Sequence, residues 1–282
     1  DQNTNWMVIS QNTTWCEWYG VTCNERRMVT RLELPQNHVQ RNIPAEFKVL
    51  PALQYLGLAE NSIGRLDSIL FEMYTLEVID LDGNGIETIP EEIPIQNEVK
   101  ELYLARNRIR EIPESISTLS KLEVLWLWTN LLEDSLPEFM GRMSNLIELD
   151  LEDNFLTGDL WPAAEMQSLE YLFIYDNIMG GEITSGFLGG NITYADGDLE
   201  SSPVLECLKL KSLDMSTNYW YGTIPTKLAN MVNMEELYLE AEADIRNSSY
   251  VEAFRKYETI LYEEPGNGPT LNSLGWLYKT QI

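Results

Sequence analysis

The feature that most constrains this chain is an internal repeat that ends on asparagine. The pattern L-x-x-L-x-L-x-x-N recurs, with other aliphatic residues at some leucine positions, at Asn37, Asn61, Asn84, Asn107, Asn130, Asn154, Asn177 and Asn218. A ninth copy, "MEELYLEAE", keeps the apolar positions but has Glu242 in place of asparagine. The first seven asparagines follow one another by 23 or 24 residues. A fixed period of this length predicts an array of structural repeats.

Each repeat predicts one short strand followed by a turn. The L-x-L step has the period of two that is typical of a strand, so its leucines share one face and the intervening residues share the other. A buried asparagine amide at the turn can satisfy backbone groups that would otherwise be costly to bury. The pattern is the signature of leucine-rich repeats. The resemblance implies an α/β fold, a right-handed solenoid with a parallel sheet on its concave face.

The chain is predicted to have three parts. Residues 1–28 form an N-terminal cap, residues 29–242 form about nine repeats, and residues 243–282 form a helical C-terminal segment. The wide step from Asn177 to Asn218 holds an insertion within residues 180–208, which we place as a loop. Four connecting segments resemble the continuation of plant-type repeats, namely "NHVQRNIP", "NFLTGDLW", "NIMGGEIT" and "NYWYGTIP". Two others, "NGIETIP" and "NRIREIP", resemble the shorter intracellular type.

The C-terminal segment carries apolar residues at helical spacing, at Tyr250, Ala253, Phe254, Tyr257, Ile260 and Leu261. Together with Pro265 and the stretch "LNSLGWLYK", it resembles one helix of a tetratricopeptide repeat and the first helix of the next. Two interpretations stay open: the helices cap the solenoid, or the sequence is the front part of a longer protein.

The stretch "WCEWYGVTC" holds two of the three cysteines. Cys16, Trp18, Gly20, Val21 and Cys23 resemble the N-terminal cap of extracellular plant-type leucine-rich-repeat proteins, such as receptor ectodomains and polygalacturonase inhibitors. The resemblance implies a Cys16–Cys23 disulfide, with aromatic rings covering the open end of the core. A zinc site needs about four ligands, and this part of the chain does not offer them. Cys207 is expected to be a buried free thiol, with pairing to a partner chain as the alternative.

Composition and sequons indicate an extracellular chain. Three N-x-S/T sequons, at Asn12, Asn191 and Asn247, together with a disulfide, favour a secreted or surface-displayed glycoprotein. The net charge of −26 disfavours nucleic acid and anionic lipid as partners. No apolar run reaches the roughly 20 residues of a membrane helix, so no membrane span is expected in this chain.

Two patterns that could carry chemistry were weighed and set aside. "DLDGNGIETIPE" matches a calcium-loop pattern with Asp80, Asp82, Asn84, Gly85 and Glu91, but its residues already belong to the third repeat and flanking helices are missing. The carboxylate pairs Asp80/Asp82 and Asp150/Glu152 are expected to lie too far apart for a two-carboxylate glycosidase. Within one pair, nothing in the sequence indicates a raised pKa. We therefore expect no metal, no cofactor and no enzymatic activity.

The outward strand positions are the best candidate for a binding surface. They combine exposed aromatic rings with acids, a combination that suits sugars or basic peptides. The alternative is that the rings only pack on one another across neighbouring strands. The predicted ligand-binding residues are Tyr103, Trp126, Trp128, Asp150, Glu152, Phe173 and Tyr175.

Two functional hypotheses follow. The first is a non-enzymatic extracellular recognition or adhesion protein, which binds a protein, peptide or glycan partner through its concave face. The second is a structural subunit of an extracellular glycoprotein fibre or matrix, which assembles end to end through the helical segment and Cys207.

Overall fold

The computed structural model describes residues 15–43, 45–183, 209–222 and 233–238. The chain divides into two compact units, Asp1–Leu132 and Glu133–Ile282, which we call unit 1 and unit 2 and describe separately. The predicted helical segment 243–282 lies outside the described residues. So do Cys207, the three sequon asparagines and most of the insertion.

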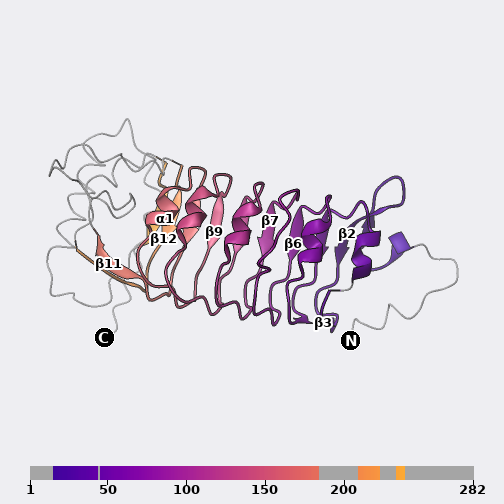
Figure 1. The fold of residues 1–282 in the computed structure, drawn as a ribbon, viewed down its shortest axis with the longest axis horizontal. Helices are drawn as coiled ribbons and strands as arrows, with labels where there is room; N and C mark the ends of the chain where they lie inside the picture. Colours follow the sequence, from indigo (N-terminus) through magenta and orange to yellow (C-terminus); the bar gives the residue numbers. More distant parts are fainter. Residues whose placement is uncertain (1–14, 44, 184–208, 223–232, 239–282) are drawn as a thin grey trace. The chain divides into compact units, whose positions relative to one another are not determined.

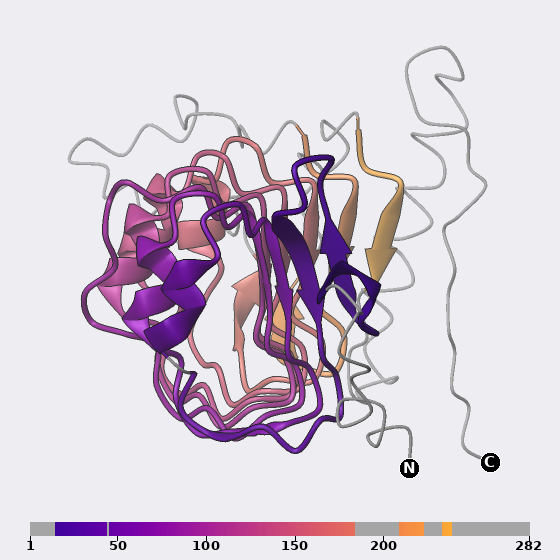
Figure 2. The ribbon, with the colours of Figure 1, turned by 90° about the vertical axis from the view of Figure 1, so that its right-hand side faces the viewer.

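Each repeat of unit 1 forms one coil of the chain, and each coil contributes one short strand to a sheet. The strands are β1 (Val21–Cys23), β2 (Val29–Glu33), β4 (Tyr55–Gly57), β6 (Val78–Asp80), β7 (Glu101–Tyr103) and β8 (Val124–Trp126), in this spatial order. The pairs from β2 to β8 are parallel, and β1 pairs antiparallel with β2. The 3-10 helices η3 (Ala45–Val49), η4 (Ser68–Glu72) and η5 (Glu114–Thr118) lie on the opposite side of the coils (Figure 2).

Unit 2 repeats this arrangement. Its sheet runs β9 (Glu148–Asp150), β10 (Tyr171–Phe173), β12 (Ser212–Asp214) and β14 (Glu236–Tyr238), with all printed pairs parallel. The 3-10 helix η6 (Glu138–Arg142) and the short helix α1 (Trp161–Ala164) belong to the connecting segments (Figure 1). In both units the first leucine of each L-x-L step stacks on its counterpart in the next strand. The prediction of leucine-rich-repeat coils with parallel strands is confirmed.

The core of each unit is built by the repeat leucines. Because the register pairs Leu32 with Leu56 and Leu102 with Leu125, equivalent side chains form continuous apolar columns. Leu56, Leu102, Leu125 and Leu149 are fully buried. Such columns bury each coil against its neighbours, so the stability of the array comes from contacts between adjacent coils.

The repeat asparagines form a ladder of hydrogen bonds beside these columns. Asn107 donates from Nδ2 to the carbonyl oxygens of Leu104 and Ala105 in its own coil, and to that of Leu81 in the preceding coil. Its Oδ1 accepts from the backbone N–H of Ile86. The same pattern holds at Asn61, Asn84, Asn130, Asn177 and Asn218. Each asparagine thus completes the turn of the coil before it, as the sequence predicted for a buried amide.

The residue before each of these asparagines adopts the left-handed conformation. Its φ is between 49° and 64° at Gln36, Glu60, Gly83, Arg106, Thr129, Asp153, Asp176 and Thr217. Only one of the eight is glycine, although this conformation is unfavourable for L-residues with a side chain. The hydrogen-bond ladder therefore stabilises a turn conformation that is unfavourable for the seven residues with a side chain.

The two types of connecting segment differ in structure. The plant-type segments hold a second set of short strands, which are β3 (Gln40–Arg41), β11 (Gly180–Ile183) and β13 (Tyr219–Gly222), and a β-bridge at Thr157. β3 pairs with β5 (Ser62–Ile63), and β11 pairs with β13. The segments "NGIETIP" and "NRIREIP" contain no strand. Strand β11 belongs to the plant-type segment 177–184 and lies at the start of the range 180–208 within which the insertion is predicted.

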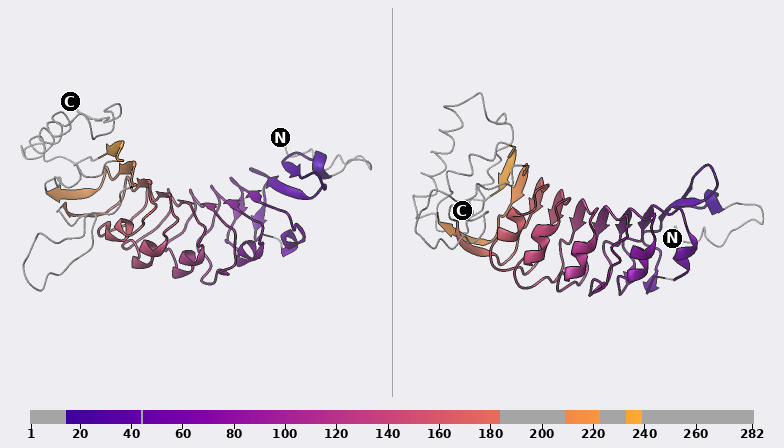
Figure 3. Two further views of the ribbon diagram at one scale, coloured as in Figure 1. Left: turned by 90° about the horizontal axis from the view of Figure 1, so that it is seen from above. Right: turned by 45° about the horizontal axis from the view of Figure 1, so that its top comes forward.

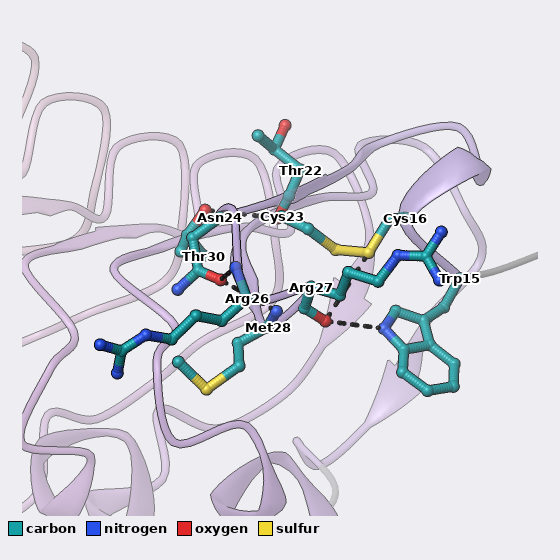
Figure 4. Close-up of a disulfide and its surroundings, with 9 residues drawn as sticks. All are labelled: Trp15, Cys16, Thr22, Cys23, Asn24, Arg26, Arg27, Met28 and Thr30. Carbon is teal, nitrogen blue, oxygen red and sulfur yellow. Dashed lines mark hydrogen bonds between the residues drawn. A yellow bond between two sulfur atoms is a disulfide. The ribbon is translucent and has the colours of Figure 1, made fainter.

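The N-terminal end of unit 1 carries the hairpin of β1 and β2 (Figure 3). The predicted Cys16–Cys23 disulfide is present, and the indole Nε1 of Trp15 donates to the carbonyl oxygen of Arg27 at 3.3 Å (Figure 4). The expectation that the aromatic rings cover the core is wrong for two of them. Trp15 is 56% exposed and Tyr19 is 69% exposed.

Candidate functional site

The outward positions of unit 1 form two rows that cross the sheet. The strand register aligns Glu33, Gly57, Asp80, Tyr103 and Trp126, which we call the first row. Two positions later on each strand lies the second row, which consists of Pro35, Ala59, Asp82, Ala105 and Trp128. The first row runs from Gly57 and Asp80 to the aromatic rings of Tyr103 and Trp126, whereas the second row ends on Trp128 after the small, buried Ala105. The sequence-predicted residues of unit 1, Tyr103, Trp126 and Trp128, are therefore brought together.

The aromatic end of the rows is ordered by contacts within the face. The rings of Tyr103 and Trp126 meet edge to face, with centroids 4.6 Å apart. The Tyr103 hydroxyl donates to Glu101 Oε2 at 2.7 Å. The alternative that rings pack on one another is thus correct for this pair, yet both rings stay partly exposed. A pair held in this way can meet a ligand at a small cost in conformational entropy.

The Trp128 ring has a cation, Arg106, over one of its sides. The Arg106 guanidinium lies over the Trp128 ring, 5.4 Å from its centroid, and forms an ion pair with Glu60. Both Glu60 and Arg106 are left-handed residues that precede a ladder asparagine. Arg106 covers one side of Trp128 and is itself paired with Glu60.

The acidic end centres on Asp80 and Asp82 of the third repeat. The backbone N–H of Asp82 donates to Asp80 Oδ1 at 3.2 Å, and the N–H of Ala105 donates to Asp82 Oδ1 at 2.6 Å. Burial raises the pKa of Asp80 above its usual range. Burial, together with the negative charge of Asp80, raises the pKa of Asp82 to about 6. The expectation that nothing raises a pKa in this pair is wrong, because burial raises the pKa of both carboxyl groups.

Tyr55 is a part of this face that the sequence analysis missed. A Cβ atom built on Gly57 would lie 2.9 Å from Tyr55 Cε1, so the phenol ring lies across the glycine. A hydrogen bond from Tyr55 opposes the rise in the pKa of Asp80, and the Arg31 guanidinium lies 3.3 Å from the centre of the Tyr55 ring. The signal was available, because Tyr55 lies two residues before Gly57 on the same strand and so shares its outward face.

The raised pKa of Asp82 predicts a dependence of stability on pH. The folded state holds this proton more tightly than the unfolded chain, whose pKa is near the ordinary 3.8. Stability from this group is therefore lost as the pH rises through the window from 3.8 to about 6. We expect Asp82→Asn to raise the free energy of unfolding at pH 7.5 by roughly 1–2 kcal/mol, after allowance for solvent screening.

Urea denaturation at pH 7.5 and at pH 3.5 measures this effect. The gain from Asp82→Asn should shrink to near zero at the lower pH, where both forms of the protein carry a neutral side chain. Glu91→Gln, at an exposed carboxylate outside the rows, is the control and should change stability little at either pH. An equal gain from Asp82→Asn at both pH values would contradict the assignment.

The calcium-loop alternative does not fit the structure. Asn84 uses its Oδ1 to accept the N–H of Ile63 at 3.0 Å, and its Nδ2 donates to backbone carbonyls of two coils. It is thus committed to the ladder and is not placed as a ligand. Across the described ranges, no group of three or more His, Cys, Asp or Glu side chains is arranged to hold a metal ion.

Unit 2 carries the remaining predicted residues. The register aligns Asp150, Phe173 and Asp214 across β9, β10 and β12. Two positions later lie Glu152 and Tyr175; Tyr175 is 38% exposed. Burial, together with the charges of Asp214 and Asp153, raises the pKa of Glu152. The four predicted residues of unit 2 thus share one outward face, on which acids alternate with aromatic rings.

Comparison with known sequences agrees with the repeat pattern. The family model described as Leucine Rich Repeat matches residues 98–119. Receptor-like protein 39 of Arabidopsis thaliana is 30% identical over 179 residues, which cover 61% of this chain and 18% of that protein. Receptor-like protein 41 of the same plant is 28% identical and covers 66% of this chain and 20% of that protein. The chain thus spans about a fifth of the length of the curated relatives it matches.

Solved structures show the same fold. The crystal structure of PEPR1-AtPEP1 has 26% sequence identity and a TM-score of 0.59, and covers 84% of this chain and 35% of that one. The leucine-rich-repeat ectodomain of the receptor kinase GASSHO1/SCHENGEN3 from Arabidopsis thaliana, in complex with CASPARIAN STRIP INTEGRITY FACTOR 2, has 24% identity and a TM-score of 0.58. It covers 85% of this chain and 33% of that one, and its likeness concerns the fold alone.

Repeats, family model, relatives and structures together support a plant-type leucine-rich-repeat protein. The two curated relatives named above are receptor-like proteins, in keeping with the prediction that this chain is non-enzymatic. In the part of the chain that the structure describes, no helix has both the length and the apolar character needed to cross a membrane.

Proposed function

We propose that this chain is the recognition part of an extracellular or surface protein and binds a protein or peptide ligand through the outward faces of its strands. The observation that carries the proposal is the aromatic cluster of unit 1, in which Tyr103 and Trp126 form an ordered, partly exposed pair beside Trp128. Aromatic side chains held in place on an open sheet are the usual anchors of a binding hot spot.

The surroundings of the cluster favour a peptide over a glycan. Arg106 lies over one side of Trp128, so less of the ring is open for a sugar to stack on. Asp80 and Asp82 lie in the same rows and attract a cationic group of a ligand. The relatives give further support, since they include receptor-like proteins and an ectodomain in complex with a factor.

Removal of the two tryptophans tests the proposal. Peptides would be selected from a displayed random library on the intact chain, and their affinities measured by titration against variants. Trp126→Ala with Trp128→Ala should weaken binding at least tenfold. The midpoint of thermal unfolding should move by only a few degrees, because both rings are partly exposed.

The control removes two exposed apolar side chains elsewhere in unit 1. Tyr74 is 64% exposed and Ile95 is 75% exposed, so their replacement by alanine should leave both affinity and stability unchanged. If the selected peptides bound the tryptophan double variant as tightly as the wild type, the outward face of unit 1 would not be the ligand site.

The proposal keeps the sequence-based organisation into a cap (1–28), repeats (29–242) and a helical tetratricopeptide-like segment (243–282), with glycans on Asn12, Asn191 and Asn247. The fibre alternative is supported by the C-terminal segment and Cys207, which lie outside the described residues. The observations that support ligand recognition lie on strand faces that the structure describes, so we prefer this function to the fibre alternative.

A further inference from the structure

Unit 2 has an apolar surface that belongs neither to its core nor to its outward strand face. Each of its described coils places a large apolar residue directly after the ladder asparagine. Phe155 is 48% exposed, Ile178 is 47% exposed and Tyr219 is 64% exposed. We call these three residues the post-asparagine stripe.

The fold does not require apolar residues at these positions. The residue one step further along the chain, such as Leu156 or Met179, is buried and supplies the core contact. In unit 1 four of the five equivalent positions, His38, Ser62, Gly85 and Arg108, are polar or lack a side chain, and the fifth is Leu131. Three neighbouring exposed apolar residues are unusual on a soluble surface and indicate an interaction site.

Exposed acids lie two residues before Phe155 and Ile178 in the sequence. Asp153 and Asp176 directly precede the ladder asparagines, and both adopt the left-handed conformation. Their backbone N–H groups donate to the carbonyl oxygens of Tyr175 and Ser216 in the following coil, which fixes where the two side chains emerge.

Cations are missing from the segments that carry the stripe. Residues 151–160, 174–183 and 215–222 contain neither lysine nor arginine. Three of the five equivalent segments of unit 1 hold arginines, at Arg41, Arg65, Arg106, Arg108 and Arg110, and the other two, 81–90 and 127–136, hold none. The apolar residues of the stripe thus all lie in segments without cations.

We propose that the post-asparagine stripe of unit 2 docks a segment of another protein that combines apolar side chains with lysine or arginine. Apolar side chains of the partner cover Phe155, Ile178 and Tyr219, and its cations meet Asp153 and Asp176. Arginine suits this surface particularly, because a guanidinium can stack on an aromatic ring while it pairs with a carboxylate. The chain itself uses such stacking where Arg31 lies over Tyr55.

Charge argues against a second copy of this chain as the occupant. Each copy carries a net charge of −26, so two copies repel one another on approach. A basic partner is attracted instead. At physiological ionic strength, charges more than about 8 Å apart are largely screened, so the acids near the contact contribute most once the two surfaces meet. This docking surface is distinct from the strand face proposed above for ligand recognition.

Synthetic peptides test the proposal in two steps. Three fluorescent peptides of equal length would be titrated at physiological ionic strength: one of leucine and arginine, one of serine and arginine, and one of leucine and glutamate. The first should bind the wild type most tightly. The variant Phe155→Ser with Ile178→Ser and Tyr219→Ser keeps the net charge and should weaken this binding at least tenfold.

A matched control separates docking from general attraction to an acidic protein. Val49, Tyr74 and Ile95 are three exposed apolar residues of unit 1, and their replacement by serine also leaves the charge unchanged. This variant should bind the leucine–arginine peptide like the wild type, whereas Asp153→Asn with Asp176→Asn should weaken it. The variant Trp126→Ala with Trp128→Ala should keep it, because those rings lie on another face.

Three results would overturn the proposal. The stripe variant could bind the leucine–arginine peptide as the wild type does, or the leucine–glutamate peptide could bind equally well. Sedimentation could also show that the wild type self-associates and that the stripe variant does not, which would make a second copy the occupant.

Discussion

Replacement of Asn107 by leucine is expected to lower the free energy of unfolding by about 4 kcal/mol. The side chain is only 8% exposed, so water cannot replace its hydrogen bonds. Leucine would remove the donor to three carbonyl oxygens, those of Leu81, Leu104 and Ala105, and the acceptor for the N–H of Ile86. Each buried backbone group left without a partner costs about 1–3 kcal/mol, and local rearrangement relieves part of the total.

The first asparagine of the series is a natural control. The side chain of Asn37 makes one hydrogen bond within the described residues, from Nδ2 to the carbonyl oxygen of Pro35. Asn37→Leu should therefore cost less than about 1 kcal/mol. Urea denaturation of both variants measures the difference, and a cost for Asn107→Leu as small as that for Asn37→Leu would show that the ladder does not stabilise the coils.

Gly20→Ala should detach β1 from β2, the strand of the first coil. Gly20 has a φ of 76°, and a Cβ atom there would lie 2.0 Å from the carbonyl oxygen of Glu33. The N–H of Glu33 also donates to the Gly20 carbonyl oxygen at 2.7 Å, so the backbone cannot move away without losing this bond. We expect a loss of roughly 3 kcal/mol, from left-handed strain together with the clash.

Gly64→Ala is the matched substitution, because a Cβ atom there meets no atom within 4 Å. It should leave stability unchanged or raise it by about 0.5 kcal/mol, since alanine restricts the unfolded chain. Hydrogen exchange would locate the effect of Gly20→Ala, with faster exchange expected at Thr22 and Cys23 of β1. Unchanged exchange in β1 would mean that the hairpin adapts to the methyl group.

The repeat pattern predicted the fold well because each of its positions has one physical role. Alternation around L-x-L placed Tyr103 and Trp126 on the outward face, and the buried amide of Asn107 was expected at the turn. The plant-type segments were distinguished by sequence, and the second strands β3, β11 and β13 occur in them. These predictions needed only contacts between equivalent positions of neighbouring coils.

Other properties of the site depend on how side chains lie across coils, and the sequence did not reveal them. The pKa of Asp82 rises because neighbouring coils bury its carboxyl group beside Asp80. Tyr55 lies across the sheet only because Gly57 leaves room for its ring. The nine-residue motif also did not reveal that Trp15 and Tyr19 are exposed.

The hydrogen-bond ladder repeats the same contacts from one coil to the next, so one coil can replace another. Ile63, Ile86 and Ile109 each donate an N–H to the asparagine of the following coil, so any such asparagine can complete any such turn. Residues 85–107 make up one whole period. If they were removed, Ile109 would take the place of Ile86 and would still donate its N–H to Asn130. The steps of 23 and 24 residues show that the ladder also accepts a coil one residue longer. A chain of this kind can therefore lengthen or shorten its sheet by whole coils during evolution.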